Sequence, residues 1–277
     1  MKKWNLIIDL ARCHDCNNCF LACKDEHVGN DFPPYSLGQP WHGHRWMNIM
    51  RQEQGQYPRV RVCYLPLPCL HCEDAPCLTP DGAVYKREDG VVVIDPEKAA
   101  GRREIVDSCP YGAIYWNEER SLAQKCTGCI HLLEDGWTET RCTQVCPTEA
   151  LRFLRATDEE MIERAAAEGL EAYRPETVPR ARVFYKNLPR YTMAFLAAGV
   201  AYADTDECAA GARATLAFAG STVGEAVAGT FGDFFIDKLE TGKTYMLTIE
   251  APGYKPASMT VDLDASTNLG TILLEAG

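Results

Sequence analysis

The sequence lacks the features that mark several common functional classes. Its longest apolar run, residues 191–203, is about 13 residues long and contains Thr192, whereas a membrane span needs about 20. Lys and Arg total 28 against 39 Asp and Glu, a net charge of −11, and nucleic-acid binding needs clustered cations. No group of residues suggests a general base, a nucleophile or a substrate pocket. These absences disfavour a direct membrane span, a nucleic-acid partner and catalysis within this chain.

An export signal is also not visible. Met1–Lys3 is followed by only a few apolar residues before Asp9 interrupts them. The chain nevertheless contains 14 cysteines. Without export, so many thiols indicate metal ligation in a reducing compartment rather than disulfides. We therefore expect a cytoplasmic protein, with export alongside a partner that carries the signal as the alternative.

The first cysteine run has a spacing with a specific chemical meaning. Four cysteines form C-x2-C-x2-C-x3-C between residues 13 and 23. Three thiolates at this spacing hold three corners of an iron–sulfur cube, and the fourth crosses to a neighbouring cube. Zinc usually takes its thiolates as separated pairs, and a disulfide framework does not require this spacing. The run predicts iron–sulfur binding, with a zinc-stabilised scaffold or disulfides as the alternatives.

The remaining cysteines complete three sets of four. The later runs are C-x2-C-x4-C from Cys69, a lone Cys109 before Pro110, and C-x2-C-x12-C-x3-C from Cys126. Pairing runs by the crossing rule predicts three [4Fe–4S] clusters. The ligand sets are group 1 (Cys13, Cys16, Cys19 and Cys146), group 2 (Cys23, Cys126, Cys129 and Cys142) and group 3 (Cys69, Cys72, Cys77 and Cys109). The x12 gap alone would also suit a zinc ribbon.

A fourth set of ligands is missing as a whole. Ferredoxin spacing counted back from Cys109, and forward from Cys77, leads to four positions that should be cysteines. They are Ala99, Arg102, Ile105 and Asp81. Because all four are replaced together, we interpret the pattern as the loss of one complete cluster.

Other residues beside the cysteines are expected to have supporting roles. His14, His71 and His131 lie near ligands, but four thiolates already complete each cube, so they are expected to surround the clusters or lie at the surface. Lys125 precedes Cys126 and would raise the reduction potential of that cluster, unless it is simply an exposed lysine.

The pattern along the chain predicts an α+β protein with two ferredoxin-like cluster-binding modules followed by a small all-β sandwich or barrel domain. The expected boundaries are 1–155 for the iron–sulfur domain, 156–198 for a helix and an extended linker or wrapping arm, and 199–277 for the β domain. Short strands are expected at 4–10, 91–94 and 114–116. A capping box, Thr157 with Glu160, begins a helix that ends at Gly169.

Two further regions have a distinct composition. Residues 29–61 are rich in Pro, Gly, Trp and Arg with little periodicity, which indicates an ordered insertion in which Trp41 and Trp46 are candidate contact aromatics. After residue 200 the side chains alternate. Tyr245, Leu247 and Ile249 should share one face of a strand.

Several motifs outside the cysteine runs support a family resemblance. They are C-H-D-C-N-N-C-F at 13–20, G-H-R-W-M-N-I at 43–49, C-P-Y-G at 109–112, Y-W-N-E-E at 115–119 and F-Y-K-N-L at 184–188. With them, residues 1–150 resemble the iron–sulfur subunit of the dimethyl sulfoxide reductase family of molybdenum enzymes. Three clusters and a C-terminal β domain resemble the pyrogallol–phloroglucinol transhydroxylase branch of that family.

The resemblance implies a function for the chain as a subunit. It implies a large partner that carries molybdenum in a molybdopterin guanine dinucleotide cofactor, together with the catalytic site for polyhydroxylated aromatics. This chain would then be a non-catalytic electron-transfer subunit of a heteromeric oxidoreductase or hydroxytransferase. The alternatives are the small subunit of another molybdenum reductase or dehydroxylase, an independent polyferredoxin, and the zinc-stabilised scaffold.

Cys63 and Cys208 are left outside the three groups and provide a first test of the assignment. As buried thiols they would behave as small apolar side chains. Replacing either one with Ala should leave the iron content per chain unchanged, measured by elemental analysis of anaerobically purified protein. Loss of one cluster's share of iron in either variant would show that the residue is a ligand.

Overall fold

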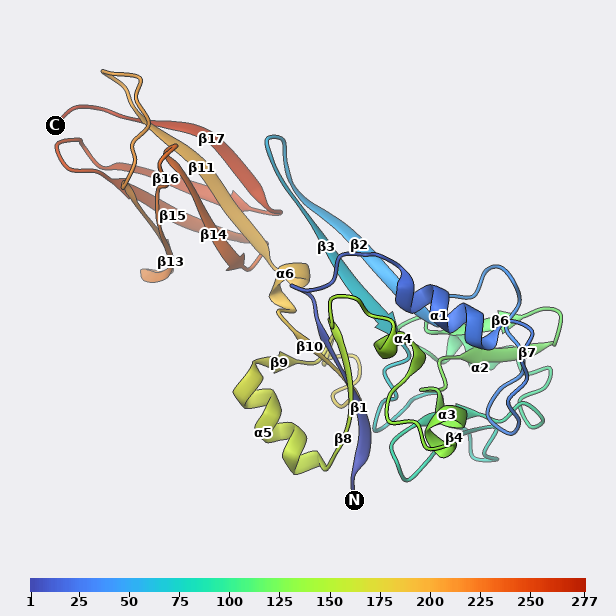
Figure 1. Cartoon of the computed structure of the whole chain (residues 1–277). Helices are drawn as coiled ribbons and strands as arrows, with labels where there is room; N and C mark the ends of the chain where they lie inside the picture. Colours follow the sequence, from blue (N-terminus) through green and yellow to red (C-terminus); the bar gives the residue numbers. More distant parts are fainter. The chain divides into compact units, whose positions relative to one another are not determined.

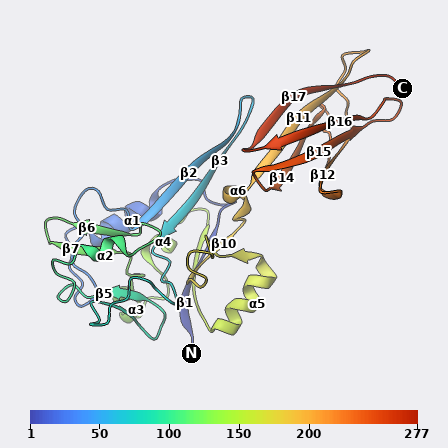
Figure 2. The same cartoon turned by 180° about the vertical axis from the view of Figure 1, so that it is seen from behind.

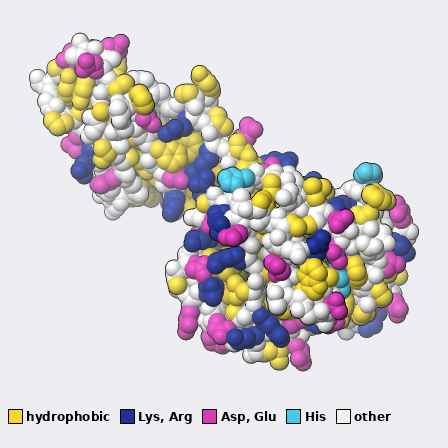
Figure 3. Space-filling view, viewed as in Figure 1, with side chains coloured by type: hydrophobic (Ala, Val, Ile, Leu, Met, Phe, Trp, Pro, Cys, Tyr) yellow, Lys and Arg dark blue, Asp and Glu magenta, His cyan; other side chains and the backbone are white.

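The computed structural model describes all residues 1–277, and strands outnumber helices (Figures 1 and 2). The chain forms two compact units. Unit 1 comprises residues 1–50 and 64–188, and unit 2 comprises residues 51–63 and 189–277. Acidic and basic side chains are both scattered over the face drawn in Figure 3. None of the helices combines the length and the apolar character needed to cross a membrane.

Unit 1 is organised around a four-stranded sheet with the order β8-β1-β10-β9. Its members are β1 (Lys3–Asp9), β8 (Leu151–Ala156), β9 (Leu170–Glu171) and β10 (Val183–Lys186). Strand β1 lies antiparallel to β8 and parallel to β10, and its Leu6, Ile7 and Ile8 are buried. Residues 156–198 were expected to form a helix and an extended linker, but two strands of this segment, β9 and β10, belong to the sheet. Because β9 and β10 satisfy their backbone groups in this sheet, residues 170–186 belong to unit 1.

The elements that carry or flank the cysteines are short. They are α1 (Asn18–His27), α2 (Glu104–Asp107), α3 (Ile130–Glu134) and α4 (Arg141–Gln144), with the hairpins β4 (Val84–Lys86)–β5 (Val92–Ile94) and β6 (Ile114–Asn117)–β7 (Leu122–Lys125). Helices α1 and α4 lie against each other. Between these elements the chain is mostly turn and loop, which lets closely spaced cysteines converge from several directions.

Helix α5 (Asp158–Glu168) begins and ends where its sequence predicts. The Thr157 hydroxyl accepts the N–H of Glu160, and the Glu160 carboxylate accepts the N–H of Thr157. Gly169 ends the helix at φ +65°, a left-handed conformation that favours glycine.

A long hairpin occupies a region where little periodicity was apparent. Strands β2 (Met47–Gln56) and β3 (Arg59–Pro68) pair with each other, and residues 51–63 of this hairpin belong to unit 2. Arg61 forms an ion pair with Asp237 at 2.7 Å, and its guanidinium lies over the Phe195 ring at 5.0 Å from the centroid. The alternation that marks a half-buried strand is weak here because most side chains of the outer segment are polar and exposed.

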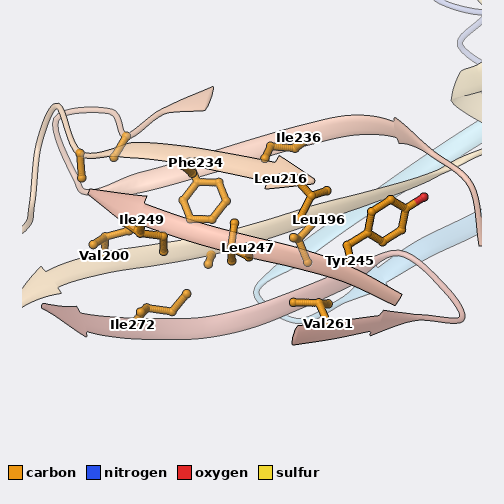
Figure 4. Packing of buried hydrophobic residues seen from close by; sticks show 14 of the residues in the cluster. Leu196, Val200, Leu216, Phe234, Ile236, Tyr245, Leu247, Ile249, Val261 and Ile272 are labelled. Carbon is orange, nitrogen blue, oxygen red and sulfur yellow. The ribbon is translucent and has the colours of Figure 1, made fainter. Parts of the chain in front are cut away.

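Unit 2 contains two sheets with the orders β14-β11-β17 and β13-β12-β15-β16. Their strands are β11 (Ala194–Tyr202), β12 (Arg213–Phe218), β13 (Ser221–Val227), β14 (Asp233–Leu239), β15 (Lys243–Glu250), β16 (Ala257–Leu263) and β17 (Thr267–Leu274), preceded by α6 (Pro189–Thr192). Side chains from both sheets form one buried core (Figure 4). The apolar run noted in the sequence is strand β11, which is buried along most of its length.

The face predicted for β15 is confirmed. Tyr245, Leu247 and Ile249 are buried and point into the core of unit 2 (Figure 4), whereas Met246 between them is 45% exposed. A strand places successive side chains on opposite faces, so hydrophobic burial determines which face of β15 meets the core.

This contrast gives a test of the core of unit 2. Leu247→Ala should lower the free energy of unfolding by about 2–5 kcal/mol, because it removes buried methyl groups and leaves a cavity. The neighbouring exposed change Met246→Ala should cost less than about 0.5 kcal/mol. Urea unfolding of the full chain measures both. Equal losses in the two variants would contradict this description of the core.

Candidate cluster-binding sites

Twelve of the fourteen cysteines lie in unit 1, and they belong to groups 1, 2 and 3. None of the cysteines in the chain is paired in a disulfide. Cys63 and Cys208, the two outside the groups, lie in unit 2. Cys63 is buried and its thiol donates to the backbone oxygen of Arg190 at 2.8 Å, and Cys208 is exposed, so only Cys63 matches the expected buried thiol.

Group 1 is formed around the start of α1 and the end of α4. Burial, followed by the charges of the nearby Cys13, Cys16 and Cys146, raises the pKa of Cys19 to about 12. Cys146 is different, because N–H groups and a hydroxyl from residues 148–151 outweigh its burial and lower its pKa. Hydrogen bonds to sulfur therefore favour the thiolate at Cys146. The structure brings all four members of group 1 within electrostatic reach of one another.

Group 2 has two buried cysteines, Cys23 and Cys129, and two that are partly buried, Cys126 and Cys142. Burial raises the pKa of Cys23 well above its usual value, and Cys126, Cys129 and Cys142 raise it further by repulsion. All four cysteines line one enclosed, largely apolar cavity. Two polar side chains contact sulfur there: Gln39 Nε2 lies 3.9 Å from Cys23 Sγ, and the Thr140 hydroxyl lies 3.1 Å from Cys142 Sγ.

Group 3 lines a separate cavity of its own. Its four cysteines surround a space that Leu70, Ile114 and other apolar residues complete. Burial, followed by the charges of Cys69, Cys109 and Cys77, raises the pKa of Cys72 to about 12. The N–H of Ala113 donates to Cys109 Sγ at 3.4 Å.

The three groups are neighbours in the order 1, 2, 3. The charge of Cys19 in group 1 raises the pKa of Cys142 in group 2. The charge of Cys69 in group 3 raises the pKa of Cys126 in group 2. Group 2 therefore adjoins both of the other groups.

The donor sets fit an iron–sulfur cube. Each group offers four thiols, and in groups 2 and 3 they surround an enclosed apolar space. Metal-bound cysteines are thiolates, and four uncompensated thiolates in an apolar cavity would repel one another strongly. Bound iron would supply the missing positive charge. The structure contains no group of three or more His, Cys, Asp or Glu side chains that lie close enough together to hold a single metal ion.

Lys125 is a buried cation between groups 2 and 3. Only 3% of it is exposed, and its ammonium donates to the backbone oxygens of Val92 and Cys126. Its charge favours the thiolate forms of Cys77, Cys109 and Cys126. The alternative of an exposed lysine is therefore wrong, and the charge acts on two groups rather than on the adjacent one alone.

The three histidines near the cysteine groups differ in their exposure and in their contacts. His14 is exposed, and His131 pairs with Glu26 at 3.0 Å. His71 is buried and lines the cavity of group 2. Burial, followed by the charges of Lys125 and Lys86, lowers the pKa of His71 well below its usual value.

The four positions of the missing ligand set contain an ion pair and two buried apolar residues. Arg102 Nη1 lies 2.7 Å from Asp81 Oδ2, and Arg102 Nε lies 2.9 Å from Glu104 Oε1. Ala99 and Ile105 are almost completely buried. These side chains make contacts with protein atoms in place of the thiolates that a cluster would need.

Sequence reasoning did not identify Gln39 and Thr140 as sulfur partners. Gln39 lies 16 residues from Cys23 along the chain, in a region without regular periodicity, so no local signal connects the two. Of the two candidate contact aromatics, Trp46 is buried and packs near His27, and Trp41 is 79% exposed.

Comparison with known proteins agrees with this geometry. Residues 60–156 match the family model described as a 4Fe-4S dicluster domain. The chain is 45% identical over 278 residues to the pyrogallol hydroxytransferase small subunit of Pelobacter acidigallici, covering 99% of this chain and 100% of that protein. It is 35% identical over 154 residues to one of the chains of the anaerobic dimethyl sulfoxide reductase of Escherichia coli, covering 54% of this chain and 73% of that one.

A third relative is a subunit of the sulfite dehydrogenase of Allochromatium vinosum, 33% identical over 165 residues and matched over 55% of this chain and 69% of its own length. These shorter matches cover about half of the chain, whereas the first covers nearly all of it, including the length of the β domain. The resemblance seen in the sequence motifs is confirmed: this protein belongs to the family of the pyrogallol hydroxytransferase small subunit, and it is related more widely to the iron–sulfur subunits of dimethyl sulfoxide reductases.

Proposed function

We propose that this chain is the electron-transferring iron–sulfur subunit of a heteromeric molybdopterin enzyme that hydroxylates or transhydroxylates polyhydroxylated aromatic rings. The observation that carries the proposal is the row of three cysteine groups in unit 1, with group 2 adjoining both neighbours. The nearly full-length similarity to a pyrogallol hydroxytransferase small subunit supports the aromatic substrate class.

The proposal assigns one [4Fe–4S] cluster to each of groups 1, 2 and 3, held in two ferredoxin-like modules within unit 1. A bound cluster of this kind accepts and returns single electrons. The residues of the chain hold the thiolates, exclude water from the cavities of groups 2 and 3, and supply hydrogen bonds and the Lys125 charge that tune the potentials.

The reaction itself is assigned to the large partner subunit. That partner would hold the molybdenum in molybdopterin guanine dinucleotide and would bind the phenol. In a transhydroxylation without net redox change, the clusters would set or restore the oxidation state of the metal. In a net hydroxylation or dehydroxylation, they would be the required electron path. Cytoplasmic location is part of the proposal and rests on the 14 cysteines, none of which is paired in a disulfide.

A second candidate is the small subunit of another molybdenum reductase. Within the cluster-binding region, the similarity to the dimethyl sulfoxide reductase and sulfite dehydrogenase relatives favours it. Those matches reach only about 55% of this chain, so they say nothing of the remainder. The two candidates differ in the substrate that the complex turns over.

The proposed function predicts the composition and activity of the purified complex. Anaerobic purification through a tag on this chain should recover a larger subunit with molybdenum, and elemental analysis should find iron and acid-labile sulfide in this chain. The complex should turn over pyrogallol or a related polyhydroxylated ring. Turnover of sulfur or nitrogen oxyanions without any phenol turnover would select the second candidate, and a colourless chain containing zinc would contradict both.

Cys109 tests the assignment of group 3. Cys109→Ala should remove the cluster of that group, about a third of the cluster iron, because its fourth thiolate is lost. The electron paramagnetic resonance signals of the other two clusters should persist. Cys63→Ala, which also removes a buried thiol but lies outside the groups, is the matched control. Loss of a different cluster in Cys109→Ala would show that the pairing is wrong.

A further inference from the structure

His71 is a buried side chain whose hydrogen bonding is only half complete. It lies between Cys69 and Cys72 in the loop of group 3, and its exposed fraction is 9%. The backbone N–H of Val92 donates to His71 Nδ1, with 3.1 Å between the nitrogens. The other ring nitrogen, Nε2, is buried and has no hydrogen-bond partner in the protein. Buried polar atoms are rarely left in this state, so a missing partner is indicated.

The bond from Val92 determines which nitrogen carries hydrogen. A nitrogen that accepts a hydrogen bond must present its lone pair, so Nδ1 is unprotonated. An imidazole with an unprotonated Nδ1 has its hydrogen on Nε2. Nε2 is therefore a donor without an acceptor. This conclusion follows from the geometry at Val92 alone.

The position of Nε2 indicates what the acceptor is. A Cβ placed on Gly128 would lie 3.7 Å from Nε2, and Gly128 stands between Cys126 and Cys129 of group 2. His71 also lines the cavity that all four cysteines of group 2 surround. Although its neighbours in sequence belong to group 3, the side chain lines the cavity of group 2, with Nε2 close to Gly128.

We propose that His71 is a positioning residue that donates a hydrogen bond from Nε2–H to a sulfur of the cluster held by group 2. The inference rests on the proposed function, because it needs a cluster in that cavity. A sulfur atom with partial negative charge supplies the acceptor that the protein lacks. His71 thereby joins the loop of group 3 to the cluster of group 2.

The expected effect is on the reduction potential. An added electron increases the negative charge on the cluster sulfurs, so a hydrogen-bond donor stabilises the reduced form more than the oxidised form. In a buried, apolar site this contribution is larger than it would be in water. His71 should therefore raise the potential of the middle carrier of the row and so favour its reduction.

Two substitutions separate this role from a purely structural one. In His71→Asn, the amide oxygen can still accept the Val92 N–H, but no donor reaches the position of Nε2. In His71→Gln, the longer side chain places an amide donor close to the position of Nε2. Both variants are prepared in the complete complex with its partner subunit, and iron and sulfide are measured before potentials are determined.

The readout is a redox titration followed by electron paramagnetic resonance. His71→Asn should shift one couple, a different one from that lost in Cys109→Ala, to lower potential. At a fixed ambient potential its oxidised-to-reduced ratio should rise by about tenfold, which is about 59 mV for one electron. His71→Gln should stay close to the wild type. Unchanged potentials in His71→Asn with all clusters present would overturn the proposal. A shift in His71→Gln without a shift in His71→Asn would also overturn the proposal, because it would show that the potential depends only on the contact with Val92.

A measurement on the wild-type complex does not depend on the folding of a variant. Electron–nuclear double resonance of the reduced protein should show a proton coupling that exchanges in deuterated buffer and a coupling to 15N in histidine-labelled material. Absence of both couplings on a loaded cluster would overturn the role of His71 and leave the proposed function intact. Absence of iron and sulfide would overturn both, so the two failures can be told apart.

Discussion

The cost of ionising buried, clustered thiols is the constraint on which cluster binding by unit 1 would depend. Each group gathers thiols whose ionised forms are disfavoured first by burial and then by one another, as at Cys19, Cys23 and Cys72. Thiols with such raised pKa values stay protonated at neutral pH, so their thiolate forms need a cation to compensate the charge. Cluster binding and folding of this unit are therefore expected to be coupled, since the free energy of metal binding contributes to the stability of the fold.

The surrounding structure fixes these loops by contacts that the cysteines themselves cannot provide. Glu73 directly follows Cys72 and pairs with Lys3 of β1 at 2.9 Å and with Lys86 of β4 at 3.2 Å. It also pairs with Arg182, next to β10. Burial alone would raise the pKa of Glu73, but hydrogen bonds from these three cations hold it at about 2. The loop of group 3 is thus anchored to the central sheet at neutral pH.

Local signals explain which parts of the fold could be predicted. The capping box of Thr157 and Glu160, and the alternation of Tyr245, Leu247 and Ile249, depend on neighbours in sequence. The β2–β3 hairpin was missed because its outer segment shows little alternation, and the parallel pairing of β10 with β1 was missed because it joins segments distant in sequence.

The same distinction applies to the candidate sites. The spacing of the cysteines is a local pattern with a known chemical meaning, and the structure brings each set into proximity. The burial of Lys125 and the direction of the His71 ring depend on packing between segments far apart in sequence. The sequence therefore indicates which cysteines would bind clusters, but not which polar side chains would tune the reduction potentials of those clusters.

Mössbauer spectroscopy of the 57Fe-labelled complex, combined with iron and protein determination, tests the central claim most directly. The account predicts that all iron in this chain is in [4Fe–4S] clusters and that there are three of them per chain. A loaded chain with two or four clusters, or with its thiolates on mononuclear zinc, would contradict the account.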